Sequence, residues 1–321
     1  MEEEKMRRTI NDAFHIITLI FLVVIILGIM TWSGMTKCSA IPGWCNVYYF
    51  VMGEPNILIV YGDSGLGDPF LLENAIEHPQ HLGKRAETAH IKNISAGLLK
   101  NYKLVIVDRA KKMSTEQMNL LIEYASTGGK LVWIGDSGTE MAEGDELLLE
   151  SERTPGSEEK PIGPWARKLS KDDGNYAVEL DKLLSVEFIG NYCDIKECTE
   201  DQLPFIGYLR KSPGKTHDLI LGLDPNLEMR GNFTLVSKRL DKYNNEVLTV
   251  DALSSIIEQK GNLNPVGTNY GDTFTVIMVS SPSGLGERVV YYSIPPEYFL
   301  LEGQPKQTYL FIENMYYSLL E

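Results

Sequence analysis

The chain has 321 residues, of which 43% are hydrophobic and 23% are charged. This composition is typical of a globular protein, and the length allows one large domain or two small ones. The formal net charge is −14 and no cluster of Lys and Arg follows residue 8, which argues against a nucleic-acid partner, because phosphate binding needs clustered positive charge.

The first expected element is a membrane-spanning helix. From Ala13 to Thr36 the chain has 24 residues without Asp, Glu, Lys or Arg. A helix of that length crosses a hydrocarbon core of about 30 Å. A cleaved signal peptide is the alternative, but its apolar centre is shorter, and only Cys38-Ser39-Ala40 resembles a cleavage site.

The charges that flank this segment predict its orientation. Lys5, Arg7 and Arg8 precede it, whereas Lys37 alone follows directly, so the positive-inside rule places the amino terminus in the cytoplasm. We therefore expect a single-pass protein of the cell membrane whose C-terminal domain lies outside and whose helix contacts the lipid bilayer. The expected parts are a cytoplasmic tail (1–12), a transmembrane helix (13–36), a juxtamembrane linker (37–54) and an extracytoplasmic α/β domain (55–321).

Four cysteines fall into two close pairs, Cys38 with Cys45 and Cys193 with Cys198. Outside the cytoplasm such pairs persist as disulfides, and we expect these two pairings. A zinc site is the alternative, but the spacings are looser than the two-residue knuckle and no histidine lies near either pair. Free thiols are the third possibility. We expect no metal ion and no cofactor.

Two sequons also bear on the compartment. Asn93-Ile94-Ser95 and Asn232-Phe233-Thr234 are compatible with glycosylation outside the cell. Two sequons in a chain of this length are close to the number expected by chance, so they add little to the orientation predicted above.

The residues after the linker alternate between buried strands and amphipathic helices. Asp68 and Pro69 are typical of a helix start, and Ser114 with Gln117 predicts a capping box. Apolar runs that are continuous rather than alternating indicate a parallel sheet covered on both faces. We expect a doubly wound, mostly parallel sheet of the flavodoxin-like or amidotransferase-like kind, with strands at residues 56–61, 103–108 and 130–134.

The second half of the chain resumes after an acidic segment. Residues 136–160 are predicted to be a solvated loop, since their acids lack the alternating spacing of a calcium site. A helix is expected near 176–184, and a closing helix over 307–320 points Ile312, Met315, Tyr316 and Leu319 toward a core. Strands are expected at residues 186–190, 205–209, 218–223, 233–237, 246–250, 273–280 and 288–293.

The tetrapeptide Gly-Asp-Ser-Gly occurs twice, at 62–65 and 135–138, each time directly after an expected parallel strand. Ligands bind at that edge of open α/β sheets, so Asp63, Ser64, Asp136 and Ser137 are candidate ligand-binding residues. The alternative is purely structural, because Gly, Asp and Ser also build tight turns and helix caps.

Residues 57–67 resemble the first block of the SGNH or GDSL hydrolases, in which a serine after the first strand attacks an ester. That resemblance implies Ser64 as the nucleophile. The family also carries a late Asp-x-x-His, and the only such pair here, Asp12 and His15, lies at the start of the expected membrane helix. The base that a serine nucleophile requires is therefore missing.

A broader resemblance extends over most of residues 55–320, to the class I glutamine amidotransferase-like superfamily and especially its trehalose-utilisation-like branch. It is carried by the order and spacing of the opening strand and five later segments, Tyr124–Gly135, Leu183–Phe188, His217–Leu223, Glu246–Leu248 and Glu287–Tyr292. Active members carry a cysteine in the turn after the strand at 130–134 and a late His-Pro-Glu.

At these two places the present chain has other residues. The turn offers Asp136 and Ser137, and the late tripeptide reads Pro295-Pro296-Glu297. The resemblance therefore implies the fold without the catalytic Cys and His, with Glu297 kept as an acceptor at the candidate ligand site. A role for His217 as a metal ligand or base is less expected than a role as a capping or surface residue.

Three functional hypotheses follow. The first is a non-catalytic, membrane-anchored domain that binds a ligand or an envelope protein partner, or takes part in assembling an envelope complex. The second is a membrane-tethered serine hydrolase that uses Ser64 or Ser137. The third is a structural spacer.

Overall fold

The computed structural model of the chain describes residues 2–32, 41, 43–53, 56–79, 81–145, 163–168, 176–196, 198, 204–212, 216–224, 227–239, 244–258, 268–281, 286–300 and 309–320. The chain divides into two compact units, residues 1–55 and residues 56–320. The Cys38–Cys45 pairing lies outside the described part, as do Cys38 itself and the side chain of Cys45.

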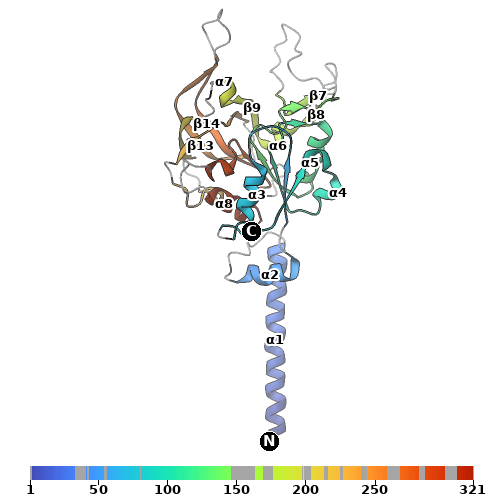
Figure 1. The fold of residues 1–321 in the computed structure, drawn as a ribbon. Coiled ribbons are helices and arrows are strands. Elements are labelled where there is room, and N and C mark those ends of the chain that lie inside the picture. The colour runs from blue at the N-terminus through green and yellow to red at the C-terminus, as the bar shows by residue number, and fades with distance from the viewer. Residues whose placement is uncertain are drawn as a thin grey trace, which may run out of the picture. The chain divides into compact units, whose positions relative to one another are not determined.

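The amino-terminal unit contains helices α1 (Glu2–Trp32) and α2 (Trp44–Met52), and Figure 1 shows α2 near the carboxyl-terminal end of α1. Within α1, the 21-residue apolar window Asn11–Thr31 contains an 18-residue stretch with a mean hydropathy of 2.9, none of it buried. The Thr18 and Thr31 hydroxyls donate to the carbonyls of Phe14 and Leu27, four residues earlier, so both are satisfied within the helix. By length and composition, α1 is apolar enough to cross a membrane.

The second unit is built on one large sheet, which among the described residues has nine strands in the order β11-β10-β13-β14-β15-β5-β3-β1-β2. Its parallel part consists of β1 (Ile57–Tyr61), β2 (Ala86–His90), β3 (Leu104–Asp108), β5 (Lys130–Ile134) and β15 (Val289–Tyr292). The sheet continues antiparallel through β14 (Thr268–Ser280), β13 (Asn244–Glu258), β10 (Phe205–Lys211) and β11 (Glu228–Arg230). The predicted α/β fold around a large central sheet is confirmed.

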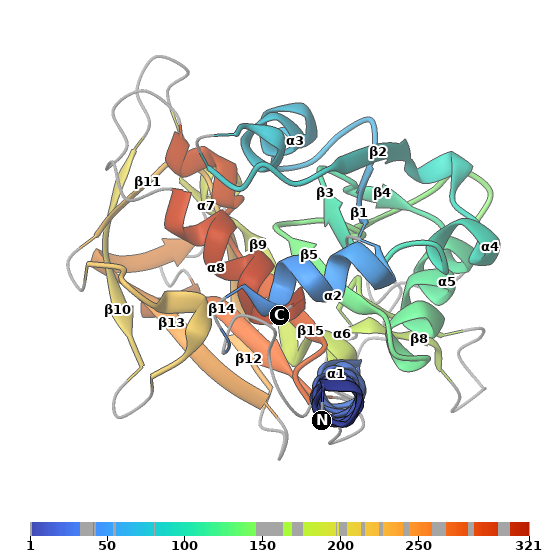
Figure 2. The same ribbon diagram turned by 90° about the horizontal axis from the view of Figure 1, so that it is seen from below.

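Helices cover both faces of the parallel strands. On one face, α3 (Pro69–Glu77) and α8 (Tyr309–Leu320) lie side by side (Figure 2). On the other, α4 (Ala96–Leu99) and α5 (Thr115–Ser126) lie together, with α6 (Leu180–Leu184) against α5 (Figure 1). Successive strand residues point to opposite faces, so Ile57 and Ile59 enter the first core while Leu58 and Val60 enter the second. Burial on both sides explains why these strands are apolar throughout.

The predicted helix ends are present. Asp68 accepts hydrogen bonds from the backbone N–H groups of Phe70 and Leu71, with Pro69 as the first residue of α3. Both bonds of the capping box between Ser114 and Gln117 are formed at the start of α5. The four core positions predicted for α8 are all buried: Ile312, Met315, Tyr316 and Leu319.

Two predicted elements are wrong. Residues Tyr176–Glu179 form strand β8, which pairs antiparallel with β7 (Ala166–Lys168), and only Leu180–Leu184 of the expected helix is helical. The expected strand at 218–223 is instead the short 3-10 helix η4 (Asp218–Ile220). The His217 ring caps η4 by accepting the Leu219 N–H, and Gly222, at φ +75°, turns the chain directly afterwards.

Shorter elements surround the sheet. The 3-10 helix η2 (Ile91–Asn93) follows β2, and η5 (Pro296–Leu300) follows β15. Helix α7 (Tyr192–Ile195) follows β9 (Val186–Asn191), which pairs with β12 (Thr234–Lys238). Strand β4 (Lys112–Met113) pairs with β6 (Glu140–Met141), at the beginning of the acidic segment.

The first residues of the acidic segment are packed rather than freely solvated. The Asp145 carboxylate accepts from the Thr115 N–H at 2.6 Å and from Arg167 at 3.1 Å. The Arg167 side chain is fully buried and also donates to the carbonyls of Met113 and Gly138. Residues 146–160 lie outside the described part.

Candidate functional site

The candidate site lies where the chain changes direction across the sheet. Along the sheet, the five parallel strands follow the order second, first, third, fourth and fifth in the chain. The connection after β1 passes through α3 on one face and that after β3 passes through α5 on the other. In open α/β sheets such a switch point, at the carboxyl ends of β1 and β3, is where ligands bind.

The two Gly-Asp-Ser-Gly turns meet at this edge. The first follows β1 and the second follows β5, and both strands pair with β3. The backbone N–H of Leu66 donates to Asp136 Oδ1 at 2.8 Å, so the loop after β1 is bonded directly to the turn after β5. The N–H of Lys111 donates to the Ser64 carbonyl at 2.8 Å, which ties the same loop to the segment after β3.

Asp136 is buried and its carboxylate is satisfied by protein groups. Besides the Leu66 N–H, it accepts from Asn191 Nδ2 at 2.9 Å, and Lys111 Nζ lies 3.9 Å from Oδ2. Asn191 Oδ1 in turn accepts from the Thr234 hydroxyl at 3.0 Å. The carboxylate therefore links the loop after β1 to the end of the strand that carries Asn191.

Ser137 is also closed off. Its residue is 0% exposed and its Oγ accepts the Ala110 N–H at 3.3 Å. The indole N–H groups of Trp133 and Trp165 both donate to its carbonyl, at 3.0 and 2.8 Å. In this arrangement the hydroxyl is not accessible to a substrate.

Asp63 and Ser64 are exposed, in contrast to their counterparts in the second turn. Asp63 Oδ2 lies 2.9 Å from Lys92 Nζ, and Oδ1 lies 3.0 Å from His90 Nε2. The hydrogen bond from Lys92, followed by that from His90, lowers the pKa of the Asp63 carboxyl. Sequence reasoning missed His90, although β2 pairs with β1 in a register that places it beside Tyr61.

His90 has both ring nitrogens engaged. Its Nδ1 accepts the Lys92 N–H at 3.2 Å, which assigns the ring proton to Nε2, the atom that faces Asp63. A general base for Ser64 would need an unprotonated nitrogen directed at the hydroxyl. His217 is paired in the same way, through Nδ1 to the Leu219 N–H and through Nε2 to Glu287 at 2.8 Å.

Glu297 and Asp108 form a buried acidic pair beneath the loop after β1. Glu297 Oε1 accepts the Asp68 N–H at 2.8 Å, whereas Glu297 Oε2 and both Asp108 oxygens have no hydrogen-bond partner among the described residues. Burial raises the pKa of Glu297 to about 8. Burial and then the Glu297 charge raise the pKa of Asp108 well above its usual value. At neutral pH the pair is therefore at least partly protonated.

The loop can approach Asp108 this closely only because residue 67 is glycine. Gly67 has φ +119°, and a Cβ on it would lie 1.9 Å from Asp108 Oδ1. The Gly67 N–H donates to the Tyr298 hydroxyl at 3.0 Å, next to Glu297. Asp108 was missed from sequence because an aspartate at the end of a strand normally reaches water.

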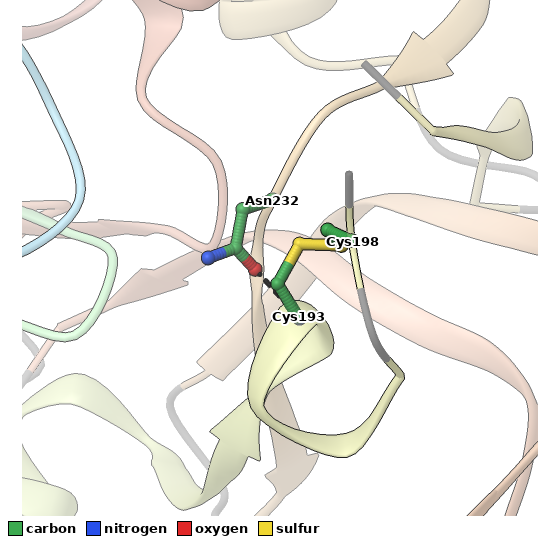
Figure 3. Close-up of a disulfide and its surroundings, with 3 residues drawn as sticks. All are labelled: Cys193, Cys198 and Asn232. Carbon is green, nitrogen blue, oxygen red and sulfur yellow. Dashed lines mark hydrogen bonds between the residues drawn. A yellow bond between two sulfur atoms is a disulfide. The ribbon is translucent and has the colours of Figure 1, made fainter. Parts of the chain in front are cut away.

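The remaining candidate residues lie in separate surroundings. Cys193 and Cys198 are joined in a disulfide with a Cα–Cα distance of 5.2 Å, and the Cys193 N–H donates to Asn232 Oδ1 at 2.9 Å (Figure 3). Asn93 is exposed at the end of η2. Glycosylation at Asn93 and Asn232 stays a prediction. No three His, Cys, Asp or Glu side chains of the described part converge on a metal-binding position.

Comparisons with known proteins give fold likenesses alone. No protein-family model matches the chain and no curated protein matches it. A ThuA-like protein from Bacteroides uniformis is similar in structure at 14% identity and a TM-score of 0.48, over 82% of this chain and 91% of that one. At these identities and TM-scores the likenesses assign no family and no activity to this chain.

Two further solved structures are similar to the same degree. A β-galactosidase from Rahnella sp. R3 matches at 13% identity and a TM-score of 0.49, over 84% of this chain but 32% of its own. The amino-terminal domain of mmIFT52 matches at 9% identity and a TM-score of 0.47, over 83% of this chain and 97% of that one.

The bonds to Asp136 predict a difference between the two turns. Asp136→Ala leaves the Leu66 N–H and the Asn191 amide without their acceptor, and we expect it to lower the free energy of unfolding by about 3 kcal/mol. Asp136→Asn keeps one oxygen for Leu66 and should cost less. Asp63→Ala, the matched change in the exposed turn, should leave the urea midpoint nearly unchanged. Equal losses at positions 63 and 136 would contradict this account.

The acidic pair predicts a dependence of stability on pH. Because the folded pKa of Glu297 is about 8, above the ordinary value of 4.5, the unfolded chain releases a proton that the folded chain keeps. The free energy of unfolding should therefore fall as pH rises from about 4.5 to about 8, with Glu297 contributing at most about 1.4 kcal/mol per pH unit and Asp108 adding its own contribution.

Glu297→Gln removes this titration, so its unfolding free energy should depend less on pH over the same range. Urea denaturation between these pH values measures the two slopes. Glu228→Gln, at a half-exposed residue paired with Arg230, is the control and should keep the wild-type slope. A full wild-type slope in the Glu297→Gln variant would mean that Glu297 ionises normally in the folded chain.

Proposed function

We propose that this chain is a membrane-anchored domain of amidotransferase-like fold that binds a protein partner at the carboxyl edge of its sheet and performs no catalysis there. The observation that carries the proposal is the closure of the turn after β5. Asp136 and Ser137 stand where the resembled superfamily has its cysteine nucleophile, and both are buried and bonded to neighbouring backbone. Because these two side chains are buried, the carboxyl edge of the sheet favours binding of a partner on its exposed surface over catalysis by the turn after β5.

The outer surface offers mixed charge beside aromatic rings. Asp63 is paired with His90 and Lys92, and the Tyr61 ring packs edge-on against His90 and against Phe70, each at 5.3 Å between centroids. Phe70 remains 54% exposed. Aromatic side chains are enriched in protein interfaces, and charges around them favour orientation and specificity. These features favour a protein partner, which for an anchored domain is a second membrane or envelope component.

The proposed anchor is α1, with its amino terminus in the cytoplasm. Lys5, Arg7 and Arg8 precede the apolar window, and positive charge is retained on the cytoplasmic side of membrane helices. This orientation leaves the second unit outside, where the Cys193–Cys198 disulfide is stable. The localisation that follows is the cell membrane, as a single-pass protein.

The competing proposal is a membrane-tethered hydrolase, and the exposed Ser64 is the observation that favours it. If the domain only binds, a serine-directed fluorophosphonate probe should leave the folded chain unlabelled, and the Ser64→Ala variant should give the same background. Stoichiometric labelling that Ser64→Ala abolishes would establish the hydrolase and remove the binding-only proposal. Denatured chain serves as the control for non-specific labelling.

Partner binding is tested by a bulky substitution at the edge. We expect Ser64→Trp to reduce, by at least about tenfold, the yield of partner crosslinked to the chain in intact membranes, because a large ring at the centre of an interface blocks contact. Ser126→Trp is the matched control, since Ser126 is exposed at the last position of α5, before the amino end of β5. Equal crosslinking by both variants would favour the structural spacer instead.

A further inference from the structure

Helix α2 has an apolar face that no described residue covers. Trp44 and Tyr48, one helical turn apart, are buried at 7% and 8% exposure and pack with Leu27 of α1. Phe50 is 91% exposed and Val51 is 73% exposed. Val47, at 47% exposure, is one helical turn before both of them, so the three residues share one surface.

This helix is attached where α1 leaves the proposed membrane. The Trp44 indole N–H donates at 2.9 Å to the hydroxyl of Thr31, the last residue of the apolar window in α1. Trp and Tyr side chains prefer the boundary between lipid headgroups and acyl chains, since their rings are apolar and their N–H and O–H groups are polar. The contact between α1 and α2 therefore has the composition of a membrane boundary.

Length and charge favour lipid as the occupant of the apolar face. The nine residues of α2 span about 14 Å as a helix, too short to cross a bilayer. Between Trp32 and Gly53 the only charged residue is Lys37, so α2 carries no charge to pair with a protein surface. Its exposed face is joined through Trp44 to the apolar surface of α1, of which Ile29 is 59% exposed.

We propose that α2 is an interfacial helix whose Val47, Phe50 and Val51 insert into the headgroup and acyl-chain boundary of the bilayer that α1 crosses. This inference rests on the membrane anchoring proposed above. A helix that lies in the plane of the membrane gains its affinity from the apolar area that it buries. Together α1 and α2 then give the chain two contacts with one membrane, perpendicular and parallel to its plane.

The test is photo-crosslinking to lipid with the full chain in phosphatidylcholine vesicles that contain an alkyne-labelled phosphatidylcholine. Benzophenone-alanine replaces Phe50 in one variant and Leu253 in the control. Leu253 is 65% exposed on β13 of the second unit, so both positions lie on the protein surface. We expect lipid labelling at position 50 to exceed that at position 253 by at least about fivefold.

A second measurement separates insertion from chance proximity. With benzophenone-alanine at position 47, the double change Phe50→Asp and Val51→Asp should reduce lipid labelling severalfold, because charged side chains withdraw α2 from the apolar boundary. Crosslinks from position 50 to protein instead of lipid, or labelling equal to that at 253, would overturn the proposal.

Alkaline carbonate extraction of the same vesicles distinguishes failure of the proposal for α2 from failure of the proposed anchoring by α1. A chain that stays in the membrane but gives no lipid adduct at position 50 contradicts the role of α2 alone. A chain that carbonate releases contradicts the anchoring by α1, and the interfacial role of α2 fails with it.

Discussion

The carboxylate of Asp136 is the interaction on which the carboxyl edge of this sheet depends. It joins three parts of the chain that are distant in sequence: the loop after β1 through Leu66, the turn after β5 to which it belongs, and the end of β9 through Asn191. A buried carboxylate without partners costs several kcal/mol, so each donor stabilises the position of the others. The loop after β1 is consequently held against the turn after β5 by a carboxylate of the protein itself.

The packing around Asp136 also determines which side chains at this edge are accessible to a ligand or partner. The turn after β5 is enclosed by Trp133, Trp165 and Asn191, whereas the turn after β1 faces water with Asp63 and Ser64. The same tetrapeptide is therefore buried after β5 and exposed after β1. Gly-Asp-Ser-Gly specifies a backbone turn, and the elements that pack over the turn determine whether its side chains are structural or accessible.

Much of the fold could be predicted from sequence because its signals are local. Apolar runs predicted β1, β3 and β5, and side-chain caps predicted the starts of α3 and α5. Strand β2, Ala86–His90, was missed because it lies at the edge of the sheet and contains no apolar run, and His90 was lost with it. The apolar run at 218–223 suggested a strand, although a 3-10 helix buries Leu219 and Ile220 equally well.

The candidate site was predictable only in part, since its most unusual groups depend on contacts distant in sequence. Asp108 and Glu297 are 189 positions apart, and nothing near either one indicates that both carboxyls will be buried beneath one loop. The loop after β1 carries glycines at positions 62, 65 and 67. At position 67 the glycine has a packing reason, because a Cβ there would overlap the Asp108 carboxyl. A glycine-rich loop at a switch point thus indicates close approach of the backbone, and the approaching group can belong to the protein itself.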